Sequence, residues 1–243
     1  MLHATNLIKA SLEVGRDFLR PPQEGGDEGV VTRPAPLLVP IRSLGVNHRA
    51  RIASHLMKLE PHDRYLRFGY TAQDEQIQRY VDGLDFERDD IFGIYNRKLE
   101  LIAMAHLAYA KDGSHDSCAE FGVSVLPSAR GKGYGARLFE RAAMHATNDG
   151  VNLLFIHALS ENAAMLKIAR NAGARVERDG SESEAFLHLP PATLDSQMTE
   201  MIEEHVAQTD YRIKVQAKQF WSFLADVQHV RRSAIDAQSR TPP

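Results

Sequence analysis

The sequence predicts an α/β domain, because segments with the pattern of strands alternate with amphipathic helical segments between residues 37 and 190. In the clearest strand, Phe121, Val123 and Val125 alternate with small or polar residues. A second strand, Asn152 to Ala158, is predominantly apolar, which is typical of a strand buried on both faces. A glycine-rich turn and a helical pattern separate these two strands, so β and α elements alternate along the chain.

Composition bounds the class of protein. The 243 residues could form one large domain, or a domain of about 150 residues with extensions. The net charge of −3 argues against a general nucleic-acid binder. The single cysteine allows no intramolecular disulfide, which suits a reducing cytoplasm. No apolar run approaches the ~18 residues of a membrane span. We therefore expect a soluble cytoplasmic protein with neither a nucleic-acid nor a membrane partner.

The N-terminal part of the chain has two expected regions. Residues 1–20 place apolar side chains on one helical face, and residues 21–36 are rich in proline, glycine and acid. We therefore expect residues 1–36 to hold a short helix and a disordered linker. The folded domain is expected over residues 37–190. It begins with a strand at Leu37–Ile41 and a helix from Asn47 to Leu59, for which Asn47 can serve as the N-cap.

The remaining elements of the domain follow from the same patterns. Before the glycine-rich turn we expect an irregular segment, a helix and a hairpin of two strands, at Pro61–Phe68, Asp74–Val81, Ile91–Tyr95 and Leu99–Tyr109. After the strand Asn152–Ala158 we expect a helix from Glu161 to Ala172, capped by Ser160 and closed by Gly173. Final strands at Val176 and Glu184–Leu189 are expected to pair across Asp179-Gly180.

Residues 191–243 predict a helical extension, because no Gly or Pro follows Pro191 before Pro242. Its apolar side chains at helical spacing are Leu194, Met198, Met201, Ile202, Ile213, Phe220, Leu224 and Val227. Asp210 could start a second helix after a break. A continuous helix of this length would reach far beyond one small domain, so a fold-back pair or a contact between two copies is expected. We favour a homodimer over docking on the chain's own core.

The turn after the strand has the chemistry of an anion site. Pro127 ends the strand, since proline has no N–H to donate to a ladder, and the segment Arg130-Gly131-Lys132-Gly133-Tyr134-Gly135 opens a helix. Backbone N–H groups can converge in such a turn, and the helix dipole adds positive potential. A Walker loop is excluded, because glycine stands where its hydroxyl residue should be, and a dinucleotide fingerprint fails at Leu138. The segment predicts a seat for another diphosphate.

The R-G-x-G-x-G segment after V-x-V-x-P resembles the acetyl-CoA-binding motif of the GNAT acyltransferase superfamily. The segment Ser160 to Ala174 is similar to a second helix of that family, and its M-L-x-[IL]-A version resembles bacterial protein lysine acetyltransferase domains. The resemblance covers about residues 37–190. It implies the GNAT fold, a central mixed and mostly antiparallel sheet flanked by helices, here with the C-terminal helical extension.

The resemblance also implies acetyl-CoA as co-substrate and a set of site residues. Cofactor-binding positions are Val123, Val125, Arg130, Gly131, Lys132, Gly133, Tyr134, Gly135 and Asn162. Glu120, ten positions before Arg130, matches the family's general base. No metal is expected, because neither H-E-x-x-H nor C-x-x-C occurs. The implied reaction moves an acetyl group directly to a primary amine, with a protein lysine slightly favoured over a small amine.

Some site residues have alternative interpretations. Glu120 lies on a polar strand face, so the alternative to a catalytic role is a solvated glutamate. Cys118 could accept the acetyl group, although a lone cysteine in a strand is more often a core filler. The family tyrosine that protonates the leaving thiolate is replaced by Ala169. His157 could substitute for it, but a hydrogen-bonded structural histidine is the more common role.

Two other classes of function compete with the enzyme. One is a regulatory module that binds CoA without catalysis. The other is an interaction protein that works through its C-terminal helices. Turnover with a panel of amines distinguishes the enzyme from both, and CoA binding without turnover identifies the first.

Overall fold

The computed structural model describes residues 39–109 and 118–238. The helix and linker expected at residues 1–36 lie outside the described residues, as do the first two residues of the strand expected at Leu37–Ile41. Residues 39–41 precede the first strand, which begins at Arg42. Within the described part, none of the helices combines the length and the apolar character that crossing a bilayer requires.

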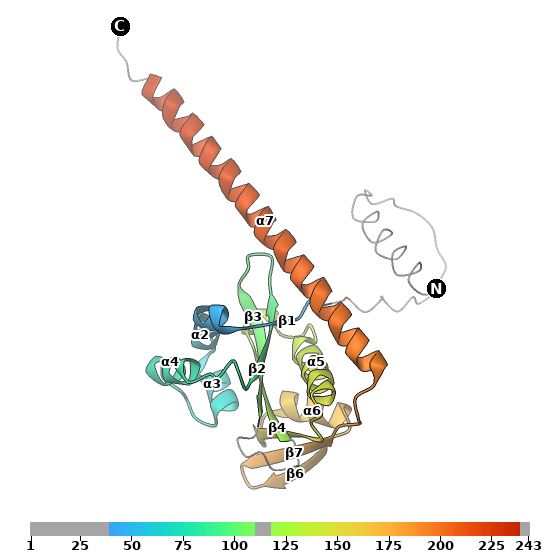
Figure 1. Cartoon of the computed structure of the whole chain (residues 1–243). Helices are drawn as coiled ribbons and strands as arrows, with labels where there is room; N and C mark the ends of the chain where they lie inside the picture. Colours follow the sequence, from blue (N-terminus) through green and yellow to red (C-terminus); the bar gives the residue numbers. More distant parts are fainter. Residues whose placement is uncertain (1–38, 110–117, 239–243) are drawn as a thin grey trace, which may run out of the picture. The chain divides into compact units, whose positions relative to one another are not determined.

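The described residues form one seven-stranded mixed sheet with strand order β1-β2-β3-β4-β5-β7-β6 (Figure 1). The strands are β1 (Arg42–Ser43), β2 (Asp90–Tyr95), β3 (Leu101–Tyr109), β4 (Cys118–Val125), β5 (Leu153–Leu159), β6 (Arg175–Asp179) and β7 (Glu182–His188). Neighbouring strands are antiparallel except β4 and β5, which run parallel. The mixed, mostly antiparallel sheet confirms the predicted fold class.

Helices cover both faces of this sheet. They are α2 (Arg49–Met57), α3 (Pro61–Phe68), α4 (Asp74–Asp82), α5 (Tyr134–Asn148), α6 (Ala163–Asn171) and α7 (Leu194–Gln238), with short 3₁₀ turns at Val46–His48 and Pro127–Ala129. Apolar side chains of α5 and α6 pack in one core with β3, β4 and β5. Those of α2 and α4 pack in a second core with β2 and β3. Figure 1 shows α2, α3 and α4 on the other side of the sheet from α5.

The alternation along β4 separates the two cores. Phe121 points to the α5 face, where its ring meets Phe139 edge to face with centroids 5.0 Å apart. Ser124 points to the opposite face, where its hydroxyl bonds His55 of α2. Successive side chains of a strand point to opposite faces. The polar set Glu120, Gly122 and Ser124 therefore shares the face that α2 and α3 cover.

Three local predictions were wrong. The N-cap of α2 is His48, because Asn47 lies within a 3₁₀ turn that precedes the helix. Pro61–Phe68, expected to be irregular, is the helix α3, since Pro61 occupies the first turn, where no N–H partner is needed, and Gly69 ends the helix with a φ of 78°.

The third error concerns α6, which begins at Ala163 rather than Glu161. Its N-cap is Asn162, whose side chain accepts a hydrogen bond of 3.1 Å from the Met165 N–H. Ser160 does not cap the helix. Its hydroxyl instead donates to the Glu182 carbonyl at 2.9 Å and contacts the Ser183 hydroxyl at 2.8 Å, which ties the end of β5 to β7.

The C-terminal extension is one helix, α7, of 45 residues. Asp210 lies inside it, so neither a restart near Asp210 nor a fold-back pair occurs. The helix contacts α5 and β1 of its own chain. Glu200 accepts hydrogen bonds from Arg141 at 2.6 Å and from Asn148, and it also contacts His145. This ion cluster holds the first part of α7 against α5.

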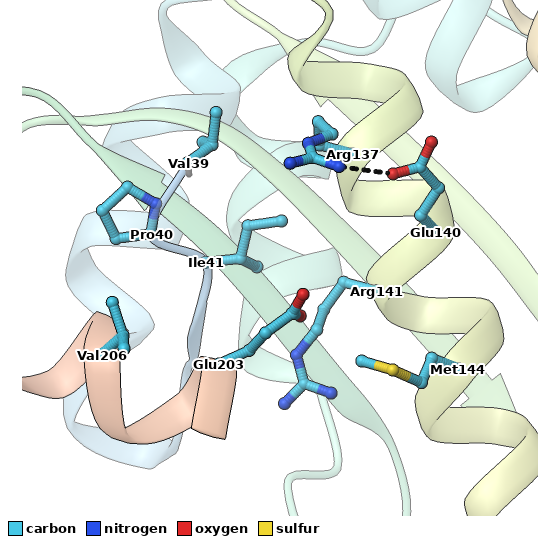
Figure 2. Close-up of a pocket in the computed structure, with 9 residues that line it drawn as sticks. All are labelled: Val39, Pro40, Ile41, Arg137, Glu140, Arg141, Met144, Glu203 and Val206. Carbon is cyan, nitrogen blue, oxygen red and sulfur yellow. Dashed lines mark hydrogen bonds and ion pairs between the residues drawn. The ribbon is translucent and has the colours of Figure 1, made fainter. Parts of the chain in front are cut away.

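Further along, Tyr211 forms a second anchor of α7. The Arg42 guanidinium lies 3.8 Å from the centre of its ring, and Arg51 donates a hydrogen bond to its hydroxyl. The next turn adds a bond of 3.2 Å from the Lys214 ammonium to the Tyr95 carbonyl. A small cavity of about 90 Å³ lies beside these anchors, between α5, α7 and the segment before β1 (Figure 2).

The docked face of α7 is mainly polar, and most of its apolar side chains up to Ile213 point away from the domain. Leu194, Met198, Met201, Ile202 and Ile213 are all exposed, with Leu194 at 80%, whereas Val206 lines the cavity between α7 and α5. At 3.6 residues per turn these side chains lie on one side of the helix, while Glu200, Glu204, Ala207 and Tyr211 lie on the other. Between Leu194 and Ile213, the expectation that the apolar face is buried is therefore not met within one chain, while Phe220, Leu224 and Val227 lie outside the described side chains.

The ion cluster predicts a pH window for the attachment of α7. Burial opposes the charge on His145, but hydrogen bonds and charges from Asp90 and Glu200 outweigh it and raise the pKa of His145 from 6.5 to about 10. Burial likewise opposes the charge on Glu200, and bonds from His145, Arg141 and Asn148 lower its pKa from 4.5 to about 2. The histidine contribution is complete below pH 6.5 and is lost toward pH 10. The glutamate contribution is complete above pH 4.5 and is lost toward pH 2.

We expect the urea midpoint of the helical signal to be highest between pH 4.5 and 6.5. Glu200→Gln should lower the free energy of unfolding by about 1–3 kcal/mol within that window, because the buried Arg141 loses a charged partner. Asp195→Asn, which removes an exposed acid from the same helix, serves as the control. An equal effect of the two substitutions would contradict the anchoring role of Glu200.

Candidate active site

The site begins where β4 and β5 part. Their parallel register runs only from Cys118↔Leu153 to Glu120↔Phe155. Beyond Glu120, β4 stays paired with β3 up to Val125, and β5 stays paired with β7 up to Leu159. The sheet therefore opens between two neighbouring strands, and a cleft of about 650 Å³ lies at this opening.

Most of the predicted cofactor-binding residues line this cleft. Val123 and Val125 come from β4, Asn162 precedes α6, and the loop contributes Arg130, Gly131, Gly133, Tyr134 and Gly135. Lys132 does not line the cleft and is exposed. Glu120 is also exposed and lies outside the lining, at the closed end of the opening. The structure thus brings together eight of the nine predicted binding residues.

The loop requires glycine at two positions. Gly131 and Gly133 both have a φ of +75°, which L-residues rarely adopt, and Gly133 is the N-cap of α5. The first N–H groups of a helix lack partners within the helix and carry the positive end of its dipole. The loop therefore presents backbone donors to the cleft, as an anion site needs.

Close packing of two helices forms the floor of the loop. A Cβ added at Gly135 would lie 3.2 Å from Cδ1 of Ile168, so glycine lets α5 approach α6. Ala169, which stands where relatives were expected to have a tyrosine, is fully buried in the core.

His157 lies outside the cleft lining, 42% exposed, with its Nε2 3.7 Å from a Glu182 oxygen. The structure therefore gives His157 no position from which to protonate a thiolate in the cleft.

Cys118 is poorly placed and poorly activated as a nucleophile. It lies before the point where the strands part and does not line the cleft. Burial raises the pKa of its thiol, and the Glu120 charge raises it further. The thiolate is the reactive form of cysteine. The position of Cys118 and the raised pKa of its thiol therefore favour a packing role over a covalent acetyl-cysteine route.

The α3 wall of the cleft was missed in the sequence. It contributes His62, Asp63, Leu66 and Arg67, a segment expected to be irregular. Asp63 forms an ion pair with Arg130, so this loop arginine is held across the mouth of the cleft. The spacing of Asp63, Leu66 and Arg67 at i, i+3 and i+4 was the helical signal available in the sequence.

A buried hydrogen-bonded pair orients the Ser124 hydroxyl, which lines the cleft. His55 is 1% exposed, and its Nδ1 lies 2.9 Å from the Leu101 carbonyl, which can only accept. Nδ1 therefore carries the hydrogen, and Nε2 accepts the Ser124 O–H at 2.8 Å. Burial is the main cause that lowers the pKa of His55 to about 4, so the ring stays neutral. The Ser124 oxygen is left to accept a hydrogen bond from the cleft side.

Metal-ligand side chains gather elsewhere. Among the described residues one group, Asp90, His145 and Asp149, has ligand atoms close enough to share an ion. It lies at the junction of α5 and α7, outside the cleft lining. Asp90 and Glu200, against the effect of burial, raise the pKa of His145 to about 10, so a metal ion would compete with a proton for this imidazole.

Comparison with known proteins identifies the family. The profile of the acetyltransferase (GNAT) family matches residues 53–174, about half of the chain. The GNAT domain of S. lividans PAT has a TM-score of 0.53 and 21% identity, over 61% of this chain and 89% of that chain. A protein from Acinetobacter baylyi ADP1, provisionally described as an acetyltransferase, has a TM-score of 0.50 and 16% identity, over 63% and 94%.

The likeness to these solved structures concerns the fold alone, since their identities are low. No curated protein matches the sequence. The family profile, in contrast, spans β4, the glycine loop and α6, which contribute to the lining of the cleft. The chain belongs to the GNAT family of acetyltransferases.

Proposed function

We propose that this protein transfers an acetyl group from acetyl-CoA to a primary amine. The observation that carries the proposal is the opening between β4 and β5 beside the Gly131–Gly135 loop. Such an opening can take the pantetheine arm, and the donors at the start of α5 can take the diphosphate. A cleft of about 650 Å³ is also within the size range of small-molecule sites.

The family resemblance assigns the roles along the cleft. The loop from Arg130 to Gly135 would hold the diphosphate, and the backbone N–H groups of Val123 and Val125 would hold the thioester carbonyl. A diphosphate would compete with Asp63 for Arg130. Asn162 would contribute by capping the N-terminus of α6 beside the cofactor arm, since its side-chain oxygen already accepts a hydrogen bond from the Met165 N–H.

In the proposed direct transfer, the amine nitrogen attacks the thioester carbonyl carbon, a C–N bond forms and the C–S bond breaks, and the second nitrogen proton passes to the departing thiolate to give the CoA thiol. Glu120 takes the proton that the ammonium must lose, either directly or through water. The CoA thiolate is a good leaving group, so the alanine at position 169 does not prevent the reaction. The rise in the pKa of Cys118, from burial and from the Glu120 charge, supports this route over an acetyl-cysteine intermediate.

A CoA-binding module without catalysis is the main rival. The observation that favours it is the position of Glu120, which is exposed and does not line the cleft. A base in that position would act through an ordered water or after a movement of its side chain. For the acceptor, the expectation of a protein lysine depends on the resemblance of the Met165 helix alone.

The first prediction concerns cofactor binding. Acetyl-CoA at about 100 times its Kd should stabilise the folded protein by ~2.7 kcal/mol, seen as a rise in Tm. Gly133→Glu should abolish the rise, because it adds a side chain and a negative charge to the diphosphate seat. Gly180→Glu is the matched control, since Gly180 also has a positive φ, 59°, but lies in the β6–β7 turn. A full Tm rise in Gly133→Glu would remove the loop from the cofactor site.

The second prediction concerns the base. Glu120→Gln should leave acetyl-CoA binding unchanged and lower kcat by about 10²-fold or more at neutral pH. The loss should shrink at high pH, where more of the acceptor amine is already neutral. Glu184→Gln, an exposed glutamate of β7, should behave as the parent. Release of free CoA thiol measures both; full activity of Glu120→Gln would return this residue to a solvated role.

We also propose that the exposed apolar face of α7 joins two copies of the chain. Met201 is 63% exposed, Ile202 50% and Ile213 60%, and they lie on the side of the helix opposite its anchors. Several large apolar side chains exposed on one side of a helix often mark an interaction surface when they form a patch. Two copies with the same face can cover it reciprocally, as twofold interfaces do.

The third prediction tests that interface. Sedimentation of the full chain at micromolar concentration should give a dimer, and Ile202→Glu should shift it to the monomer. Gln197→Glu adds the same charge at an exposed polar position of α7 and should leave the dimer intact. A monomeric parent would rule out the interface; a dimer that survives Ile202→Glu would place it elsewhere.

A further inference from the structure

Arg67 is a cleft residue to which the reaction proposed above gives no role. It lies on α3 and lines the cleft opposite β4. Its guanidinium packs directly on Gly122: a Cβ added there would lie 2.8 Å from both Cζ and Nη2 of Arg67. A side chain at position 122 would displace the guanidinium. Because Gly122 has none, Arg67 can pack against the backbone of β4.

A chain of hydrogen bonds fixes the orientation of this guanidinium. Nη2 of Arg67 donates to the Tyr80 hydroxyl at 3.0 Å, and that hydroxyl lies 2.8 Å from Nδ1 of His106. Nε2 of His106 lies 3.1 Å from a carboxylate oxygen of Asp89, which is 5% exposed. The carboxylate can only accept, so the hydrogen of His106 is on Nε2 and Tyr80 donates to Nδ1. Each hydrogen bond between Arg67 and Asp89 in this chain then joins one donor to one acceptor.

Two aromatic rings complete the support. The Arg67 guanidinium lies 5.2 Å from the centre of the Phe68 ring and 5.6 Å from that of Tyr80. A guanidinium that is held by rings and by one hydrogen bond keeps its remaining N–H donors in a fixed plane. Such a preorganised plane matches the two oxygens of a carboxylate.

The charge of Arg67 has no partner in the described part of the chain. Its one hydrogen bond goes to the neutral Tyr80 hydroxyl, and no carboxylate there forms an ion pair with it. The other arginine of the cleft, Arg130, is paired with Asp63. A half-buried cation without an anion is costly, so the ligand of the cleft is the natural source of the missing negative charge.

The neighbouring groups along β4 define the rest of the ligand. Glu120, Gly122 and Ser124 share one face of the strand, so neighbouring positions on that face repeat about every 6.8 Å. The Arg67 guanidinium lies over Gly122, the middle position, with the Glu120 carboxylate on one side along the strand and the accepting oxygen of Ser124 on the other. The face therefore offers a donor plane for an anion and acceptors on either side for an ammonium or amine.

We propose that Arg67 binds the carboxylate of the acceptor, and that the acceptor is a free amino acid whose amine receives the acetyl group. This proposal rests on the acetyl transfer proposed above and selects the small-molecule class of acceptor. The lysine side chain of a protein carries no carboxylate beside its amine, so it would bring a lone cation toward the guanidinium. An amino acid carries both charges, and the carboxylate compensates the repulsion.

Matched acceptors test the proposal on the full chain. After a screen of the standard amino acids, release of free CoA thiol is measured with L-phenylalanine and phenethylamine, and with L-lysine and cadaverine. The parent should have a kcat/KM for the better amino acid that is at least about tenfold above that of its decarboxylated partner, the range of a hydrogen bond to a charged group. Equal or better use of the decarboxylated amines, or of a lysine-containing peptide, would overturn the proposal.

Substitutions then separate acceptor binding from other roles of Arg67. Arg67→Gln should raise KM for the amino acid by about 10- to 100-fold but should not raise KM for the decarboxylated amine, which loses only a repulsion. Tyr80→Phe, which removes only the orienting hydroxyl, should raise the same KM less. Arg79→Gln, an exposed arginine of α4, is the control. An equal loss with both acceptors, or a lost Tm response to acetyl-CoA in Arg67→Gln, would overturn carboxylate binding.

Failure of the acetyl transfer itself would look different. In that case no acceptor, charged or neutral, releases CoA thiol from the parent, whereas failure of the carboxylate proposal alone leaves turnover of amines without discrimination. Arg67→Lys adds a last check, because it keeps the charge but not the planar pair of donors. It should recover only part of the discrimination.

Discussion

The parting of β4 and β5 after Glu120 is the constraint on which the site depends. Up to that residue the two strands share a parallel register, and beyond it each keeps only its outer partner. Unpaired main chain inside a sheet is unfavourable unless something else satisfies it. A ligand that inserts along β4 can do so, which makes the opening a binding site. The glycine loop at its edge, with Gly131 and Gly133 at a φ of +75°, supplies the anion end of the same ligand.

The two faces of β4 divide the work of folding and function. On one face Phe121 packs against Phe139 of α5 and holds the strand in the larger core. On the other face two polar chains reach the strand, one from Leu101 through His55 to Ser124 and one from Asp89 through His106 and Tyr80 to Arg67. Buried polar networks stabilise one arrangement only when every member is satisfied. Both chains end at the cleft, so core hydrogen bonding sets the orientation of groups that face the ligand.

The sequence was sufficient for the order of the elements and for the loop, because glycine spacing and strand alternation are local signals. It was insufficient for α3, because Pro61 and the short length of the segment obscured the helical pattern. The packing of α3 on the cleft also depends on Gly122, which is far away in the chain. The same limit applies to His55, since only the register of Ser124 against α2 brings that pair together. For α7, helical spacing was correct, but the choice of docked face depends on Arg141, His145 and Tyr211 contacts that no local pattern contains.

The charge of Arg67 also bears on how an acceptor amine could lose its proton. Burial is the largest cause of the lowered pKa of His106, and the positive charge of Arg67 is the next. The same charge contributes, after burial and the charge of Lys58, to the lowered pKa of His55. The field of Arg67 thus favours neutral over protonated nitrogen bases on this side of β4. The carboxylate of a bound amino acid offsets this field, so Arg67 neither repels its ammonium nor lowers the pKa of that ammonium. Loss of the proton then depends on a base such as Glu120, acting directly or through water.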